Sequence, residues 1–252
     1  MSIEALKKGA MEHMRTTSMA LAWVIGLVAA AVIVAKPWVT IQHTQPIVVK
    51  GYAEMGVTSD SGSLKVSVVE SDSTSSRAYE AAGEALERVR QIVAADLGKS
   101  VEVLELQSQI TEVYKVDGNG RRTNEVEFYR ASRQIRVSTA DVEGLARVGR
   151  LIYDLNGEGM RVHVAGPEFF VSSLEDVKRQ LLTLATENGK QRAEILATNS
   201  GERLGSLVSA RQGVIQITKK NSSQTSSYGI YDTETIEKVV KLVVTLEFEI
   251  SS

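Results

Sequence analysis

The sequence predicts an α+β protein, with a single N-terminal transmembrane helix followed by a domain of long antiparallel β-hairpins packed with helices. Residues 19–35 contain no charged residue and no proline, which predicts the membrane helix. After this run, apolar residues recur every two residues in some segments, which is typical of strands, and every 3.6 residues in others, which is typical of helices. We therefore divide the chain into an N-terminal segment 1–17, a transmembrane helix 18–36, a linker 37–46 and a folded domain 47–252.

The apolar run is long enough to span a lipid bilayer once. At 1.5 Å per residue, a helix over residues 19–35 rises about 26 Å, close to the roughly 30 Å of the hydrocarbon core. A buried core helix is one alternative, but a helix that is apolar on all sides needs a large protein around it. A cleaved secretory signal is another, although its small-residue cleavage site would lie inside the run, at Ala29 and Ala31. We expect an uncleaved anchor that binds membrane lipid.

The residues around and within the run indicate its orientation and packing. Three basic residues lie in segment 1–17, whereas Lys36 and Lys50 follow the run. The positive-inside rule then predicts a cytoplasmic N-terminus and an exported domain. Small residues allow close packing of membrane helices, and the alternative is that this face meets lipid. The candidate packing residues are Gly26, Ala29 and Ala30.

Composition excludes several classes of function. The chain has 29 basic and 31 acidic residues and a net charge of -2, so it lacks the basic patch of a nucleic-acid-binding protein. It has no cysteine, which excludes a disulfide framework, thiolate catalysis and cysteine-ligated zinc. Its three histidines are scattered along the chain. We expect no nucleic acid, no metal, no cofactor and no enzymatic activity.

The folded domain begins with a predicted strand pair and a helix. Residues 47–55 and 63–69 alternate as strands, and the polar turn 58–62 between them predicts a hairpin. A helix is expected over 73–97, because apolar residues fall on one face. Gly98 lies where a helix C-terminal glycine belongs.

A second hairpin follows this helix. Residues 101–116 and 126–138 alternate as long strands on either side of the turn sequence DGNGRR at 117–122. Arg121 and Arg122 at its tip could contact acidic lipid or the carboxylates of a neighbouring subunit. The alternative is that both arginines face water.

The second half of the chain repeats this plan after an intervening helix and strand. A helix is predicted over 141–155. A strand follows over 162–171, in which Pro167 indicates a sheet edge or a bulge. The longest helix is expected over 173–199. Strands over 207–218 and 236–250 then form a final hairpin. Apolar residues predicted on or near the inner face of that helix include Leu181, Leu184, Ala185, Ile195 and Leu196.

The loop 219–235 within the final hairpin is a candidate contact surface. It is too long for a tight turn, and it carries Tyr228, Ile230 and Tyr231 among serines and threonines. This composition suits contact with a partner protein or with a neighbouring subunit. The alternative is a mobile hairpin tip.

The order of residues over 47–250 resembles the SIMPL-domain family, whose bacterial members are exported proteins associated with stress responses and outer-surface antigens. The family usually has a proline after the opening strand, where this chain has Thr58 and Ser59. The opening strand is matched by Ile47, Val49, Gly51, Ala53, Glu54 and Val57; the later helix and its exit by Ala185, Lys190, Ala193, Leu196, Ala197, Gly201, Leu204, Gly205 and Val208; and the closing strand by Phe248 and Ile250.

This resemblance implies an α+β fold of antiparallel sheet with packed helices, and in some members assembly into large rings. It implies no established active site. We therefore expect a non-enzymatic homo-oligomer in the periplasm, anchored in the bacterial inner membrane, that forms a ring-like scaffold with a role in stress protection; its other protein partners are unknown. The alternatives are an envelope hydrolase, for which Glu54 and Asp60 are the paired carboxylates, and a ligand-binding sensor that signals through the single span.

Overall fold

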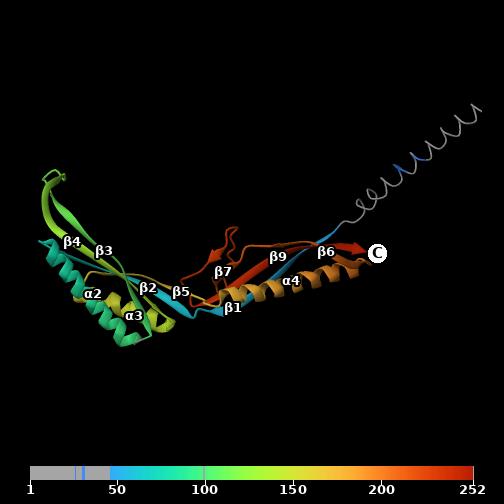
Figure 1. Cartoon of the computed structure of the whole chain (residues 1–252), viewed down its shortest axis with the longest axis horizontal. Coiled ribbons are helices and arrows are strands. Elements are labelled where there is room, and N and C mark those ends of the chain that lie inside the picture. Colours follow the sequence, from blue (N-terminus) through green and yellow to red (C-terminus); the bar gives the residue numbers. More distant parts are fainter. Residues whose placement is uncertain (1–25, 27–29, 32–45, 99, 252) are drawn as a thin grey trace, which may run out of the picture. The chain divides into compact units, whose positions relative to one another are not determined.

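The computed structural model describes residues 26, 30–31, 46–98 and 100–251 (Figure 1). The predicted segments 1–17, 18–36 and 37–46 lie outside these residues, except for Gly26, Ala30, Ala31 and Pro46. The fold is α+β, as predicted. Its elements are β1 (Ile47–Thr58), β2 (Ser61–Asp72), α2 (Ser75–Leu97), β3 (Val101–Val116), β4 (Arg122–Thr139), α3 (Val142–Asp154), the 3-10 turn η1 (Leu155–Glu158), β5 (Val162–Phe170), α4 (Leu174–Asn199), β6 (Arg203–Gln212), β7 (Gln216–Lys219), β8 (Ile230–Tyr231) and β9 (Glu237–Ser251).

The strands form two sheets that are mostly antiparallel. One sheet has the order β3-β4-β2-β5, and the other has the order β1-β9-β7-β8 with β6 also paired to β9. The predicted hairpin of β1 and β2 is therefore wrong, because these two strands belong to different sheets. Residues 59 and 60, which connect β1 to β2, are hydrogen-bonded to segments distant in sequence. The Ser59 amide donates to the Ile236 carbonyl at 2.9 Å, and the Asp60 amide donates to the Phe170 carbonyl at 3.0 Å.

Both sheets contain the same strand–helix–strand–strand plan. In the first case β2, α2, β3 and β4 give the strand order β2-β4-β3. In the second case β1, α4, β6 and β9 give the order β1-β9-β6, so the last strand is again central. This arrangement agrees with the duplicated architecture that the sequence suggests.

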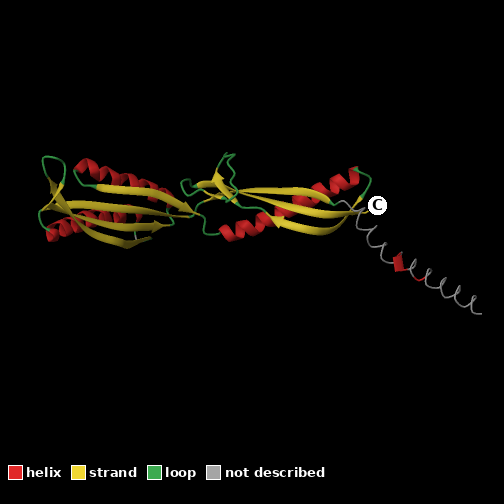
Figure 2. Ribbon diagram, turned by 90° about the horizontal axis from the view of Figure 1, so that it is seen from above, coloured by secondary structure: helices red, strands yellow, loops and turns green. Residues whose placement is uncertain are grey.

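The described residues divide into two compact units. The first contains Gly189–Arg211, Thr245–Ser252 and the described part of Met1–Lys50, and the second contains Gly51–Asn188 and Gln212–Val244. In the second unit, α2 and α3 cover one face of the four-stranded sheet (Figure 2). The core between them includes the fully buried Leu64, Val66, Val68, Val89, Ile135, Leu145 and Ile152.

Local sequence signals determine where these helices begin and end. The Thr74 hydroxyl accepts a hydrogen bond from the Arg77 amide and caps α2, and Gly98 follows the helix with a φ of +66°. The Asp141 carboxylate accepts a hydrogen bond from the Gly144 amide at 2.8 Å and caps α3. The predicted bounds of both helices are confirmed to within about two residues.

The β3–β4 hairpin and the β5 edge also agree with the sequence predictions. At the hairpin tip, the Asp117 carboxylate accepts the amides of Asn119 and Arg121, each at 2.9 Å. Strand β5 lies at an edge of its sheet, and its register with β2 shifts near Pro167. Proline is tolerated there because an edge strand can lack one amide donor.

The inner face of α4 agrees with the prediction only in part. Its buried residues lie four apart, and Leu181 and Ala185 are among them as predicted. The stripe begins with Val177 and Leu181 and continues with small residues only, at Ala185, Gly189, Ala193 and Ala197. Leu184, Ile195 and Leu196, expected on the inner face, are instead 45%, 60% and 50% exposed. A stripe of small side chains lets the helix lie close to its neighbours, so the larger apolar residues flank the contact and remain on the surface.

The final hairpin is interrupted on one side. Strands β6 and β7 both pair with β9, and between them the Gly213 amide donates to the Val243 carbonyl at 2.8 Å. A Cβ at position 213 would lie 2.8 Å from the same carbonyl oxygen, so only glycine fits without displacing the backbone. Among the residues that the structure describes, no helix is long and apolar enough to cross a bilayer.

Candidate functional site

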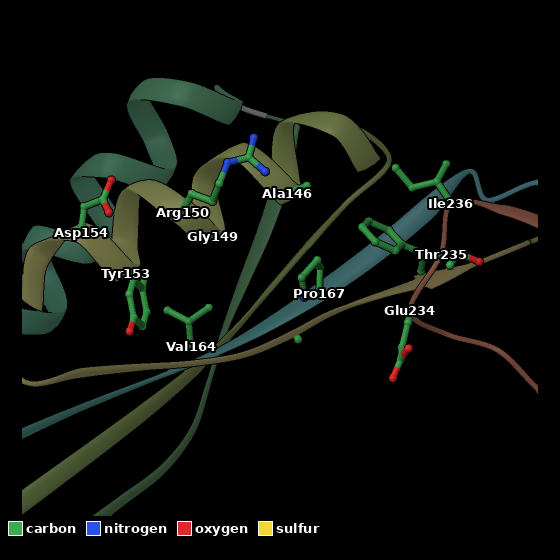
Figure 3. A pocket seen from close by; sticks show the side chains of 12 residues that line it. Ala146, Gly149, Arg150, Tyr153, Asp154, Val164, Pro167, Glu234, Thr235 and Ile236 are labelled. Atoms are coloured by element: carbon green, nitrogen blue, oxygen red, sulfur yellow. The ribbon is translucent and has the colours of Figure 1, made fainter. Parts of the chain in front are cut away.

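A groove of about 860 Å³ lies in the second unit, between α3, β5 and the segment 234–236 that precedes β9 (Figure 3). Helix α3 contributes one wall, β5 contributes the floor, and 234–236 contributes the opposite wall. The lining residues are Ala146, Gly149, Arg150, Tyr153, Asp154, Val164, Gly166, Pro167, Phe169, Glu234, Thr235 and Ile236.

Local backbone geometry opens this groove. Gly149 and Ala146 present little side chain on the groove side of α3. Gly166 has a φ of +82°, and Pro167 follows it at the register shift, where three steps along β5 oppose two along β2. Such a bulge bends the strand away from a regular path. The groove therefore follows from a small-residue helix face opposite a bulged edge strand.

A buried ion pair supports the wall opposite α3. The Lys238 ammonium lies 3.6 Å from the Asp232 carboxylate, and the two side chains are 1% and 6% exposed. The Thr235 hydroxyl donates to the Asp232 carboxylate, and the Lys238 ammonium donates to the Thr235 carbonyl. The Glu234 amide donates to the other Asp232 oxygen at 3.1 Å. These bonds tie the loop 232–238 into a compact turn.

Burial and hydrogen bonding shift the ionisation of this pair in identifiable ways. Burial lowers the pKa of Lys238, because its ammonium has lost hydrating water. Burial alone would raise the pKa of Asp232, but the Thr235 hydroxyl, the Glu234 amide and the Lys238 charge together bring it below its usual value. Removing either partner would leave a buried charge without its counterion.

The same wall is bonded to two other segments of the unit. The Phe169 amide donates to the Thr233 carbonyl at 2.7 Å, and the Ser59 amide donates to the Ile236 carbonyl at 2.9 Å. The wall is therefore continuous with β5 and with the connection between β1 and β2.

The groove is suited to docking an apolar side chain. Its lining is mainly apolar, and its charged groups are Arg150, Asp154 and Glu234. An apolar centre with a polar rim is the usual composition of a protein–protein contact. Across the described part of the chain, no group of three or more His, Asp or Glu residues is placed to hold a metal ion.

The predicted carboxylate pair has separate structural partners. The Asp60 carboxylate accepts hydrogen bonds from the amide and hydroxyl of Ser172, which hold its pKa below the usual value. The Glu54 carboxylate accepts the hydroxyl of Tyr52. Burial raises the pKa of Tyr52 to about 12, and the Glu54 carboxylate adds to this effect.

The two arginines of the hairpin tip are both exposed, which is expected under either alternative. The Arg122 guanidinium lies 3.9 Å from the centre of the Tyr114 ring, a cation–π distance. Arg121 donates its backbone amide to Asp117. Their role in a subunit or lipid contact stays a prediction.

The loop 219–235 presents Tyr228 on a supported backbone. The Gln216 side chain brackets Ser226, donating to its carbonyl at 2.7 Å and accepting from its amide at 3.3 Å. The following residues Ile230 and Tyr231 form β8, parallel to β7. Tyr228 is 96% exposed and Tyr231 51% exposed, so both rings are available to a partner.

The membrane-helix candidates are only partly described. Gly26 and Ala30 are helical and exposed, and a Cβ at Gly26 would meet nothing within 4 Å. Ala29 lies outside the described residues. Packing of this face against another helix stays a prediction.

The outer edge of β3 is an exposed surface that the sequence does not single out. Strand β3 is the end strand of its sheet and is 16 residues long. In the described part of the chain, only β4 pairs with it. Its exposed apolar residues are Leu104 at 52%, Leu106 at 37%, Ile110 at 45% and Val116 at 66%. The alternation of apolar residues predicts this strand, and the structure confirms it. Alternation alone does not reveal which strand lies at the edge of a sheet.

The arrangement described so far is that of an α+β protein with two sheets built on one repeated plan. The sequence model of the family described as SIMPL, protein of unknown function (DUF541), matches residues 47–248. The chain belongs to this family, as the sequence resemblance indicates. The comparison with curated proteins finds no match.

Proposed function

We propose that this chain is a non-enzymatic scaffold of the bacterial cell envelope, which self-assembles through its SIMPL domain while an N-terminal helix anchors it in the inner membrane. In this arrangement the N-terminus lies in the cytoplasm and the domain in the periplasm. The apolar run 19–35 and the charges on its flanks support the anchor and its orientation. A ring-like assembly would suit a role in stress protection.

The observation that carries the proposal is the outer edge of β3. A long edge strand presents a row of amides and carbonyls that can pair with another chain. Natural edges are usually blocked by lysine, proline, bulges or a covering element. Strand β3 contains bulges near residues 105–107 and 113–116, but its register with β4 is regular from Gln107 to Val113. That stretch is long enough to pair with a second copy.

A ring needs a second surface of a different kind. Pairing of β3 with β3 of another copy gives a two-fold contact and stops at a dimer, whereas a head-to-tail contact can close into a ring. Tyr228 and the groove at α3 offer complementary surfaces for such a contact: an exposed ring on a supported loop, and an apolar groove. Anchoring every copy in one membrane would raise the local concentration and favour both contacts.

The experiment measures oligomer size after the β3 edge is blocked. Leu104→Lys and Ile110→Lys place charges on this edge, and lysine is a residue that natural edges use to prevent pairing. We expect the full chain in mild detergent to form an oligomer by light scattering, and the double variant to be smaller. Leu151→Lys, on the exposed face of α3, is the matched control and keeps the wild-type size. A wild-type monomer at working concentration would contradict the proposal.

A further inference from the structure

The first unit carries an apolar groove of its own, between the start of β1 and the C-terminal part of α4. Its volume is about 410 Å³. Val48, Ile195 and Leu196 lie in its lining and are 59%, 60% and 50% exposed. Ile195 and Leu196 are the residues that the small-residue stripe of α4 leaves on the surface. The remaining lining residues are Val49, Lys50 and Arg192.

Two cations border this apolar surface. The Arg192 guanidinium donates to the Lys50 carbonyl at 3.1 Å, which holds the arginine beside β1. The only carboxylate within three residues of Arg192 on α4 is Glu194, and it lies 3.8 Å from the Lys190 ammonium. Exposed apolar side chains beside lysine and arginine are characteristic of protein surfaces that rest on anionic lipid.

The position of this groove in the chain brings it near the predicted anchor. The predicted membrane helix ends at residue 36, and Val48 is the second residue of β1, the opening strand of the folded domain. The chain from residue 37 to Val48 reaches at most about 43 Å when fully extended. Val48 is therefore tethered within that distance of the end of the predicted membrane helix, whichever conformation the linker adopts.

We propose that the groove of Val48, Ile195 and Leu196 rests on the anionic surface of the membrane, with Lys50 and Arg192 against lipid phosphates. This inference depends on the proposed membrane anchor, because the anchor supplies the proximity. The apolar side chains enter the boundary between headgroups and acyl chains, and the two cations remain at headgroup level. The contact would fix the orientation of the first unit on the membrane and limit its rotation about the linker.

The chain has no cysteine, so a single label can be placed on either unit. Ile195→Cys carries a polarity-sensitive fluorophore in the full chain, reconstituted in phosphatidylcholine–phosphatidylglycerol vesicles that contain doxyl-labelled lipid. Leu151→Cys, 43% exposed on α3, is the matched control. We expect blue-shifted emission and strong lipid quenching at position 195, and solvent-like emission with little quenching at position 151.

Charge is tested in the same vesicles. Replacing phosphatidylglycerol with phosphatidylcholine, or introducing Lys50→Gln into the Ile195→Cys chain, is expected to reduce the quenching at position 195. Quenching at 195 that equals the control, in a chain that floats with the vesicles, would overturn the lipid contact but not the anchor. Failure to float would overturn both. A label shielded from lipid and also from aqueous iodide would show that a second copy or the apolar run covers the groove, and would overturn the inference.

Discussion

At the scale of single residues, the ion pair of Lys238 and Asp232 is the most buried among the ion pairs of the described residues. Both side chains are almost fully buried, and each charge compensates the other. A buried ion pair adds little over apolar packing, but removal of one partner leaves an isolated charge in the interior. The pair therefore acts as a constraint on the loop 232–238 more than as a source of net stability.

We predict that Lys238→Met lowers the free energy of unfolding by about 3 kcal/mol, because Asp232 then remains buried without a counterion. The double variant Asp232→Asn with Lys238→Met should recover part of this loss. Urea unfolding of the full chain in mild detergent measures these values, and wild type, Lys238→Met, Asp232→Asn and the double variant form a double-mutant cycle. If the losses in the two single variants added up to the loss in the double variant, the two side chains would not be coupled.

Asp60 gives a prediction for the dependence of stability on pH. Hydrogen bonds from Ser172 hold its pKa in the folded chain below that of an unfolded aspartate, near 3.9. Its stabilising contribution is thus complete above that unfolded value and is lost as pH falls through the folded value. We expect Asp60→Asn to be less stable than wild type at pH 6 by less than about 1 kcal/mol, because Asp60 is exposed and water screens its charge.

The same comparison at low pH provides the check. The difference in unfolding free energy between wild type and Asp60→Asn should narrow as pH falls below 4, because the wild-type carboxylate is then protonated. A constant difference from pH 6 to pH 2 would mean that the charge of Asp60 does not contribute to stability.

At the scale of elements, the division of β6 from β7 depends on one glycine. We predict that Gly213→Ala lowers the unfolding free energy by about 1–3 kcal/mol, since the new methyl group would lie 2.8 Å from the Val243 carbonyl. Gly118→Ala is the control, because a Cβ there meets nothing within 4 Å. If thermal or urea unfolding showed the same small change in both variants, the close approach to Val243 would not be a structural requirement.

Elements defined by local signals could be predicted from the sequence. Thr74, Asp141 and Gly98 are local cap residues, and the β3–β4 hairpin follows from alternation around a turn. The partner of β1 could not be predicted from local signals. The residues after β1 donate hydrogen bonds to the carbonyls of Ile236 and Phe170, which are distant in sequence. Periodicity also placed Ile195 on the wrong face of α4, since it does not reveal that small residues make the contact.

The candidate surfaces were predictable to a similar extent. Tyr228 was identified because an aromatic residue in a long polar loop is conspicuous in the sequence, and the structure leaves its ring exposed. The groove at α3 was not identified, because its walls come from three segments that only the fold brings together. The one local signal was Pro167, which marked β5 as an edge or a bulge.

At the scale of the whole molecule, the proposed assembly combines a membrane anchor, the SIMPL domain and two contact surfaces. The SIMPL domain carries the β3 edge and the groove at α3, and in the proposed assembly the predicted membrane helix would bring copies together. Weak contacts become effective when many copies share one membrane. Assembly should thus be more extensive in vesicles than in dilute detergent solution.

The central claim is that β3 pairs with another copy, and hydrogen–deuterium exchange of the full chain tests it most directly. The account predicts that backbone amides within Gln107–Val113 exchange slowly at high protein concentration and faster after dilution, while amides of α2 exchange at the same rate in both. Exchange in Gln107–Val113 that is independent of concentration, in samples whose size differs by light scattering, would show that the copies associate through another surface.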